Sequence, residues 1–363
     1  MAGYYVVEPP ALEAFGTRIF VALGTPEDIA AEVAAHLVRA NLAGHDSHGA
    51  MRILQYASMI ADGWLRPAAR PSVVRRRGAT VLVDAAEGFG QFSTSFALEQ
   101  AIALAAEQGA GVAAVRRSHH IGRLGDYTER AARRGYVAQV TVGAAGPGVG
   151  GAAPFGGAAR FLGTNPWSLA VPTPGEPVVA DFATTVIAEG KVRVARAKGE
   201  ALPPGCIVDA GGHPSTDPAD FYAGGMLLPA GGHKGYALSL GAALIGGLAA
   251  IGESEPSVAG AAARPTSDGK GERLGGVLLL VIDPGAFGDP AAYLDATARV
   301  TAALKRVPPA PGTAEVLLPG EPEVRSRAQR EREGIVLPQE TWDALTKLAA
   351  THDLPMPPAT PQG

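Results

Sequence analysis

The longest apolar run in the sequence covers residues 235–252, and it limits the possible folds more than any other feature. The run is about long enough to span a bilayer. It contains five glycines, however, together with the hydroxyl groups of Tyr236 and Ser239, and it lacks flanking aromatic and charged anchors. We therefore predict a buried helix inside a folded domain and no membrane span.

Helical and strand patterns are mixed along the rest of the chain, which indicates an α/β protein. Residues 252–274 form a polar loop in this interpretation, and the proline-rich residues 354–363 form a frayed tail. We expect helices over residues 10–23, 26–43, 48–62, 93–108, 122–134, 183–198, 233–250, 291–305 and 339–350. We expect strands over residues 72–74, 80–84, 111–116, 137–143, 169–171, 178–181 and 275–283.

Cys206 is the single cysteine of the chain, so no intramolecular disulfide can form and a reducing compartment is favoured. It lies in the apolar, proline-rich segment 202–208, which favours a packing role over a nucleophilic one. The first ten residues contain neither a basic region nor an apolar region of a secretory signal. We therefore expect a cytoplasmic protein. The net charge of −4 and the scattered basic residues do not favour binding to nucleic acid.

The segment Gly44-His45-Asp46-Ser47-His48-Gly49-Ala50-Met51-Arg52 concentrates acid/base groups between two helical patterns. If Asp46 or Ser47 caps a helix that begins here, His48 and Arg52 lie one turn apart on the same face. A 2-oxo acid needs such a pair, because the imidazole can give a proton to the carbonyl oxygen and the guanidinium can bind the carboxylate. Ordinary capping of a helix by Asp-Ser is the structural alternative.

Four further polar clusters stand at the expected ends of elements, and together they favour a shared site. Histidines between a strand and a helix N-terminus are well placed to contact a phosphate, and Lys234 could supply a cation. Taken singly, each cluster is typical of a cap or a turn. The clusters are Ser118-His119-His120-Ile121-Gly122, Phe161-Leu162-Gly163-Thr164-Asn165-Pro166, Asp181-Phe182-Ala183-Thr184 and His233-Lys234-Gly235.

The glycine-rich segment Gly146-Pro147-Gly148-Val149-Gly150-Gly151 follows a strand but does not match a Rossmann fingerprint. Pro147 and Pro154 would interrupt the helix that must open there, and no suitably placed acidic residue follows to bind a ribose. If the chain binds a dinucleotide, it does so by another route.

A metal-dependent hydrolase is a weaker alternative. His45 and His48 are closely spaced, but no Glu stands between them as in zinc proteases, and the adjacent histidines His119 and His120 rarely ligate one ion together. Ser47 adjoins His48 in the sequence, so the two are poorly placed for a nucleophilic triad. We therefore predict no metal site.

Nine motifs stand in order along the chain, and together they resemble the malate/L-lactate dehydrogenase family of the non-Rossmann kind over roughly residues 10–350. The paired histidines and the segment Pro203-Pro204-Gly205-Cys206 are similar to those of the hydroxycarboxylate dehydrogenases in that family. The motifs are Ala43-Gly44-His45-Asp46-Ser47-His48-Gly49, Ser118-His119-His120-Ile121-Gly122, Ala153-Pro154-Phe155-Gly156-Gly157, Leu162-Gly163-Thr164-Asn165-Pro166, Asp181-Phe182-Ala183-Thr184, Ala188-Glu189-Gly190-Lys191, Thr216-Asp217-Pro218, His233-Lys234-Gly235-Tyr236-Ala237 and Leu318-Pro319-Gly320-Glu321.

The resemblance implies oxidoreduction between 2-hydroxy acids and 2-oxo acids with NAD or NADP, in a homodimer. It implies that His48 is the general acid/base with Ser47 beside it, that Arg52 binds the carboxylate, and that Thr164 is a second substrate contact. The implied cofactor contacts are His120, Ile121, Gly122, Arg123, Leu124, Asp181, Phe182, Ala183, His233, Lys234, Pro319, Gly320 and Glu321.

The family resemblance also implies a fold with two structural regions: a non-Rossmann mixed-sheet cofactor domain and a helical domain built from both chain ends. With 363 residues the chain is long enough for this organisation. We predict a helical N-terminal part over residues 1–70, an α/β cofactor- and substrate-binding domain over residues 71–289, and a C-terminal helical part over residues 290–363 that packs with the N-terminal part.

Lys191 separates two branches of the family. The cyclic-imine reductases, which act on piperideine or pyrroline carboxylates, carry an Asp where this chain has Lys191. Lys191 therefore favours an oxo-acid substrate and is a candidate catalytic residue. A cyclic-imine reductase is the alternative function within the family. Residues 252–274 do not align with the family pattern.

Overall fold

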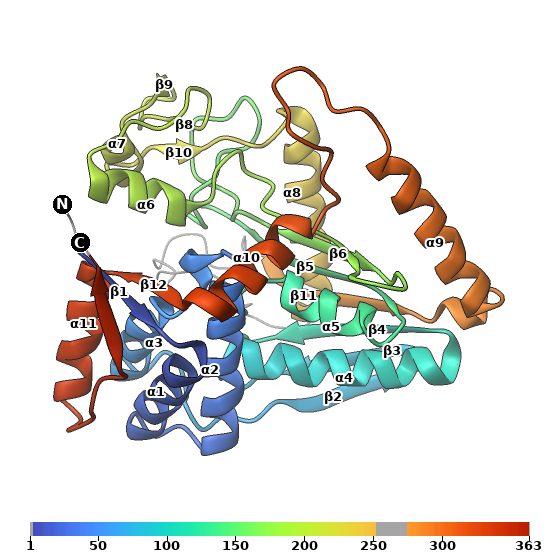
Figure 1. Cartoon of the computed structure of the whole chain (residues 1–363), viewed down its shortest axis with the longest axis horizontal. Coiled ribbons are helices and arrows are strands. Elements are labelled where there is room, and N and C mark those ends of the chain that lie inside the picture. Colours follow the sequence, from blue (N-terminus) through green and yellow to red (C-terminus); the bar gives the residue numbers. More distant parts are fainter. Residues whose placement is uncertain (1–2, 252–273, 363) are drawn as a thin grey trace.

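A seven-stranded mixed sheet forms the centre of the computed structural model, which describes residues 3–251 and 274–362 (Figure 1). The strand order is β2-β3-β4-β11-β5-β6-β7, with one parallel pair, β3 and β4. The α/β prediction is confirmed. The strands of this sheet are β2 (Ser72–Arg77), β3 (Thr80–Asp84), β4 (Ala110–Arg116), β5 (Val137–Ala145), β6 (Trp167–Val171), β7 (Val178–Phe182) and β11 (Leu274–Ile282). The helices of the structure are α1 (Pro9–Ala22), α2 (Glu27–Leu42), α3 (Arg52–Ala61), α4 (Gly90–Gln108), α5 (Gly125–Ala132), α6 (Glu189–Lys198), α7 (Pro218–Tyr222), α8 (His233–Gly246), α9 (Pro290–Lys305), α10 (Glu321–Glu333) and α11 (Gln339–Ala350), with short 3-10 turns η1 (Asp46–His48), η2 (Gly247–Ala250) and η3 (Pro284–Ala286).

Successive strand residues point to opposite faces of the sheet, and different helices cover these two faces. Val140 and Val142 of β5 belong to the core that the sheet forms with α4 and α5. On the other face, a Cβ added at Gly143 would lie 2.1 Å from the backbone oxygen of Ala242 in α8. Glycine at this position therefore lets α8 lie directly against the strand backbone.

The predicted burial of the long apolar run holds for only one face of α8. Ser239 and Ala243 are buried, whereas Leu238 and Leu244 are 42% and 56% exposed. Beyond the end of the helix, Leu248 is 53% exposed. In residues 3–251 and 274–362, no helix is long and apolar enough to cross a membrane.

A second core joins the two ends of the chain. Phe15, Phe20 and Tyr56 from the first helices pack in it with Leu345 of α11. The predicted frayed tail is wrong for its last residues, because they form a strand that pairs with the N-terminal strand, so the chain ends lie together (Figure 1). This small sheet has the order β12-β1-β13, with β1 (Tyr4–Val7), β12 (Ile335–Pro338) and β13 (Ala359–Gln362).

Helix α9 lies apart from this second core, beside the sheet (Figure 1). The Thr297 hydroxyl donates to the backbone oxygen of Pro172, just after β6, at 3.2 Å. The division at residues 70 and 289 stays a prediction. Residues 252–273 of the expected polar loop lie outside the described residues.

A small lobe above the sheet contains α6, α7 and three two-residue strands (Figure 1). Ile207, Phe221 and Leu227 form its core together with Cys206. Burial raises the pKa of the Cys206 thiol, which agrees with the predicted packing role. The strands are β8 (Ile207–Val208), β9 (Pro214–Ser215) and β10 (Met226–Leu227).

Two predicted helix starts are wrong by four residues or more. The helix expected from residue 48 begins at Arg52, and the helix expected from residue 183 begins at Glu189. In both cases the residues before the helix make other contacts, and a local capping pattern does not reveal them.

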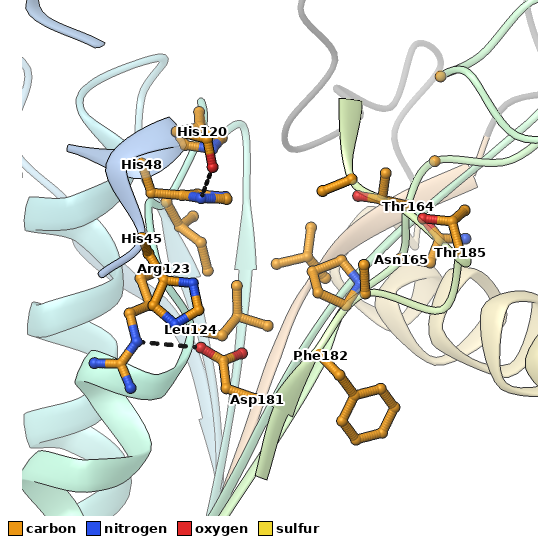
Figure 2. A pocket seen from close by; sticks show the side chains of 18 of the residues that line it. His45, His48, His120, Arg123, Leu124, Thr164, Asn165, Asp181, Phe182 and Thr185 are labelled. Carbon is orange, nitrogen blue, oxygen red and sulfur yellow. Dashed lines mark hydrogen bonds and ion pairs between the residues drawn. The ribbon is translucent and has the colours of Figure 1, made fainter. Parts of the chain in front are cut away.

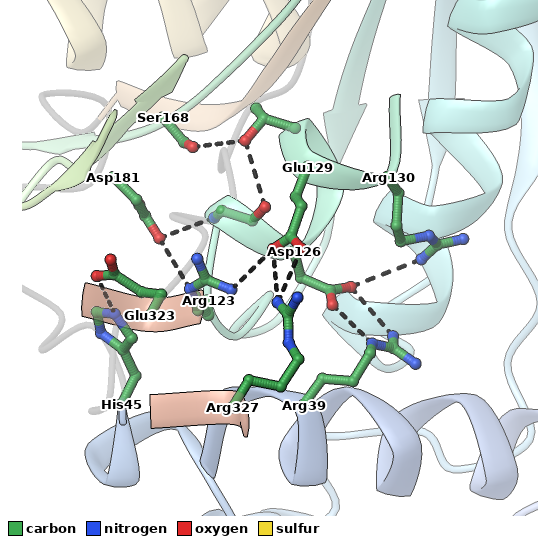
Figure 3. A network of polar contacts seen from close by, with 12 residues as sticks. Arg39, His45, Arg123, Asp126, Glu129, Arg130, Ser168, Asp181, Glu323 and Arg327 are labelled. Atoms are coloured by element: carbon green, nitrogen blue, oxygen red, sulfur yellow. Dashed lines mark hydrogen bonds and ion pairs between the residues drawn. The ribbon is translucent and has the colours of Figure 1, made fainter. Parts of the chain in front are cut away.

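Helix α10 is absent from the sequence prediction. None of its side chains is buried, so it has no apolar stripe that a periodicity search could detect. Instead it is held by ion pairs to other helices, such as Arg327 with Glu129 of α5 at 2.8 Å. Figure 3 shows this pair within a wider network of charges.

Candidate active site

A pocket of about 430 Å³ lies between His48 and His120 on one side and Thr164 and Thr185 on the other, beside Asp181 at the end of β7 (Figure 2). Most of the predicted site residues line it. Arg52, His233, Lys234, Pro319, Gly320 and Glu321 do not. The predicted residues that line this pocket are Ser47, His48, His120, Ile121, Gly122, Arg123, Leu124, Thr164, Asp181, Phe182, Ala183 and Lys191.

The turn η1 that carries Ser47 and His48 is fixed from α2. The buried amide of Asn41 donates to the Asp46 carboxylate at 2.6 Å and accepts from the backbone N–H of Ala50 at 2.8 Å. A Cβ added at Gly49 would lie 2.2 Å from the Asn41 side-chain oxygen, so glycine is required there. Arg330 of α10 pairs with the same carboxylate. The predicted cap by Asp46 or Ser47 is therefore wrong, because long-range partners engage Asp46 instead.

His48 is held as a neutral imidazole. Its Nδ1 lies 3.0 Å from the hydroxyl oxygen of Ser47. Burial lowers its pKa to about 3, and the positive charge of Arg52 acts in the same direction. A neutral imidazole can accept a proton from a bound hydroxyl group.

Arg52 begins α3 and does not share a helical turn with His48. Its Nε donates to the backbone oxygen of Ser47 at 2.6 Å, and its Nη1 bonds the side-chain oxygen of Gln55. Burial lowers its pKa. No carboxylate forms an ion pair with Arg52 in residues 3–251 and 274–362, so its charge acts on the two neighbouring histidines.

His120 lies beside His48 although the two residues are far apart in the sequence. The two rings stack with their centroids 5.4 Å apart. The Nδ1 of His120 lies 2.7 Å from the hydroxyl oxygen of Tyr56, which in turn accepts a hydrogen bond from the amide of Gln91 at 2.6 Å. Tyr56 and Gln91 are missing from the sequence prediction, since in the sequence alone they read as ordinary helical residues.

Arg123 lies at the base of the pocket in a network of charges that joins α5, β7 and α10 (Figure 3). Its guanidinium is almost fully buried, 3.5 Å from Asp181 and 3.6 Å from Glu129. Burial raises the pKa of Asp181, although Arg123 opposes the shift. The Nε of Arg123 forms the ion pair with Asp181 at 3.5 Å, and it makes no hydrogen bond among the described residues. This donor at the wall of the pocket is therefore only partly engaged.

The backbone next to Arg123 is held by His36. The Nε2 of His36 accepts the N–H of Arg123 at 3.0 Å, and its Nδ1 lies 3.3 Å from Asp126. Gly122 has a φ of 79°, and a Cβ there would lie 2.2 Å from the same Nε2. The loop from His120 to Leu124 is therefore packed against α2 and cannot shift freely.

Pro319, Gly320 and Glu321 line a second pocket of about 440 Å³ together with Val178 of β7. A small third pocket shares Arg123 with the first pocket and Gly320 with the second. The three pockets therefore follow one strand edge. The Glu321 carboxylate is engaged by Lys305 and by the N–H of Leu318, both at 2.8 Å.

His233 and Lys234 stand at the exposed start of α8 and line neither of these pockets. His233 packs edge-on against Phe155, with the ring centroids 6.2 Å apart. Within the described ranges, no group of three or more His, Cys, Asp or Glu side chains is arranged to hold a metal ion.

Comparison with known proteins identifies the family. The model of the malate/L-lactate dehydrogenase family matches residues 7–346. Hydroxycarboxylate dehydrogenase B from Escherichia coli K12 is 36% identical over 349 residues, which cover 95% of this chain and 93% of that protein. A Delta(1)-pyrroline-2-carboxylate/Delta(1)-piperideine-2-carboxylate reductase from Pseudomonas syringae pv. tomato is 36% identical over 338 residues, 92% of this chain and 93% of that protein.

A solved structure leads to the same conclusion. Sulfolactate dehydrogenase from Methanocaldococcus jannaschii superposes with a TM-score of 0.85 at 31% identity, over 97% of this chain and 98% of that one. The resemblance predicted from the nine motifs is thus confirmed: the chain belongs to the malate/L-lactate dehydrogenase family.

Proposed function

We propose that this protein is an NAD(P)-dependent oxidoreductase that interconverts a 2-hydroxy acid and a 2-oxo acid. The observation that carries the proposal is the pair of stacked, neutral imidazoles of His48 and His120 in one pocket. Lys191 and Thr164 line the same pocket, and no carboxylate pairs with Lys191 among the described residues. The pocket therefore offers proton-transfer groups beside a cation for an acidic substrate.

The dinucleotide fits along β7 in this proposal. The loop from His120 to Leu124, which includes Arg123, and residues 181–183 would hold its nicotinamide half in the first pocket. Pro319, Gly320 and Glu321 would contact its other half in the second pocket, and we assign no direct contact to His233 or Lys234. The mixed sheet with its single parallel pair would serve as a non-Rossmann cofactor domain, beside a helical domain built from both chain ends. When bound, the nicotinamide supplies or accepts the hydride at C2 of the substrate.

His48 moves the proton in this proposal. In the oxidation of a hydroxy acid, its neutral ring accepts the hydroxyl proton, and the Ser47 hydroxyl oxygen 3.0 Å from its Nδ1 holds the ring in place. In the reduction of an oxo acid, protonated His48 gives the proton back to the oxygen at C2. A bound carboxylate raises the pKa of a nearby imidazole and so favours this protonated form.

Arg52 and Thr164 bind the substrate in this proposal. Arg52 does not line the pocket, but its guanidinium is tied to the turn of His48 through the carbonyl of Ser47, which does line it. A carboxylate that reaches Arg52 would therefore lie close to the imidazole. To bind both carboxylate oxygens, Arg52 must release Gln55. Thr164, which lines the pocket, is the second substrate contact, and Lys191 lines the same pocket as the candidate catalytic residue.

Two copies of the chain form a homodimer in this proposal, and its cytoplasmic location stays a prediction from sequence. On α8 and its extension, Leu238, Leu244 and Leu248 are exposed. An exposed apolar patch of this kind is typical of an interface between subunits.

The direct test is the loss of reduced-nicotinamide absorbance with NADH or NADPH and a panel of pyruvate, oxaloacetate, phenylpyruvate, 2-oxoglutarate and a cyclic imine. Oxidation with an oxo acid supports the proposal and identifies the cofactor. Turnover of the imine alone would favour the alternative function, which the Pseudomonas syringae reductase represents at 36% identity. Hydrolytic activity that depends on a metal ion retained by the purified protein, without nicotinamide oxidation, would contradict both the dehydrogenase and the imine reductase.

A further inference from the structure

Gln91 is connected to the active-site pocket although it does not line it. It lies in the first turn of α4 and is fully buried. Its amide nitrogen donates to the hydroxyl oxygen of Tyr56 at 2.6 Å, and that oxygen lies 2.7 Å from Nδ1 of His120. The amide oxygen of Gln91 has no partner among the described residues, so Tyr56 is the one polar contact of this side chain there.

The start of α4 is pressed against the histidine pair, which fixes the distance between Gln91 and His120. A Cβ added at Gly90 would lie 2.4 Å from the backbone oxygens of both His119 and His120. The hydroxyl groups of Ser93 and Ser118 lie 3.3 Å apart across the same contact. Backbone therefore touches backbone here, and Gln91 has a defined position relative to the pocket.

The direction of the hydrogen bonds follows from the number of protons. Burial raises the pKa of Tyr56 to about 12, so its hydroxyl keeps its one proton at neutral pH. Because the oxygen accepts from Gln91, that proton is free to point at Nδ1 of His120. Burial also lowers the pKa of His120 well below its ordinary value, so the ring is neutral and carries one proton. With Nδ1 as the acceptor, that proton belongs to Nε2.

We propose that Gln91 is a positioning residue that holds His120 as the Nε2–H tautomer and so makes it a hydrogen-bond donor in the substrate pocket. The consequence for catalysis rests on the proposed function. His48 then transfers the proton, while the Nε2–H of His120 polarises the oxygen at C2 of the oxo acid. Without the amide of Gln91, the Tyr56 hydroxyl could reverse its bond, and Nε2 of His120 would become an acceptor.

The test is the tautomer of His120, read by NMR of the protein with [15N]-histidine and no substrate, with the signals assigned by the loss that His120→Asn causes. We expect Nε2 to carry the proton in the natural protein. In Gln91→Glu, studied at a pH where the introduced carboxylate is ionised, the Tyr56 hydroxyl must donate to that carboxylate, so the proton of His120 should move to Nδ1. Gln91→Met, which keeps the length of the side chain without hydrogen bonds, should give a mixture of tautomers.

Kinetics provide the second readout. We expect Gln91→Glu to lower kcat by about 10-fold, the effect of one hydrogen bond, while the KM for the cofactor stays unchanged. Tyr56→Phe removes the hydroxyl group between Gln91 and His120, so it should also abolish the tautomer preference. This variant provides the test if Gln91→Glu does not fold. A proton on Nδ1 in the natural protein, or one tautomer in all variants, would overturn the proposal. The tautomer is measured without turnover, so missing dehydrogenase activity would overturn only the proposed function.

Discussion

The imidazole rings of His48 and His120 stack at an interplanar angle of 23° with their centroids 5.4 Å apart. One ring comes from the turn before α3 and the other from the segment after β4. Burial and the charge of Arg52 lower both pKa values, so the two rings meet without charge repulsion. Each neutral ring keeps one N–H group and one nitrogen lone pair, so it can donate or accept a proton.

His48→Ala should lower kcat by about 100-fold or more, the usual effect of losing a general acid/base. The measurement is steady-state oxidation of reduced nicotinamide with the best oxo acid of the panel. His213→Ala is the matched control, because the side chain of His213 is 81% exposed and lies outside the pocket. If His48→Ala keeps near-normal activity while binding cofactor, His48 does not carry the proton.

Arg52→Lys should raise the KM for the oxo acid by about 10-fold or more, because an ammonium group cannot bind a carboxylate with two parallel hydrogen bonds. It also removes the Nε that holds the Ser47 carbonyl. Arg18→Lys on the exposed face of α1 serves as the control. An unchanged KM in the Arg52 variant would argue against Arg52 as the carboxylate clamp.

The lowered pKa of His48 predicts a distinctive pH profile. Oxidation of the hydroxy acid uses neutral His48, so its kcat/KM should stay flat as the pH falls through 6.5 and should decline only toward the pKa of about 3. The unfolded chain binds a proton at His48 near pH 6.5 and the folded protein does not, so stability should fall below that pH. Circular dichroism at each pH separates unfolding from titration. An acidic limb with a midpoint near 6.5 in folded protein would contradict the assignment.

Gly122→Ala should raise the KM for the cofactor by about 10-fold or more and destabilise the fold by about 1–3 kcal/mol. The added Cβ would meet His36 at 2.2 Å and displace the loop that carries Arg123. Gly135→Ala is the matched control, since its φ is 90° and no atom of the residues that the structure describes lies within 4 Å of the added Cβ. Equal KM values in the two variants would mean that the loop does not hold the cofactor.

Leu248→Glu should convert the proposed homodimer into a monomer, because a charge would enter the apolar face formed with Leu238 and Leu244. Sedimentation velocity measures the change. Val21→Glu on α1, where the side chain is 44% exposed, controls for the added charge. If the natural protein is a monomer, or if both variants remain dimeric, this face is not the interface.

The sequence by itself determined most of the elements and the family. Period-two and helical patterns are local, so strands such as β4 and helices such as α11 were predictable within one or two residues. The nine motifs also carried the identity of the family, because an ordered set of short segments is far more specific than any one of them. The same motifs contain fifteen of the residues that line the main pocket, although the sequence does not show how these residues are arranged in space.

Only the tertiary structure decided how these residues meet. The turn of His48 is a 3-10 turn and not a helix start, because Asn41 and Arg330 engage Asp46 from distant parts of the chain. The hydrogen bonds that link Gln91 and Tyr56 to His120 depend on the packing of α3 and α4 against His120. Helix α10 could not be predicted from the sequence, because ion pairs hold it in place and it has no buried apolar stripe. Hydrogen bonds and ion pairs between distant residues leave no periodic trace in the sequence, whereas burial of a helix or strand face does.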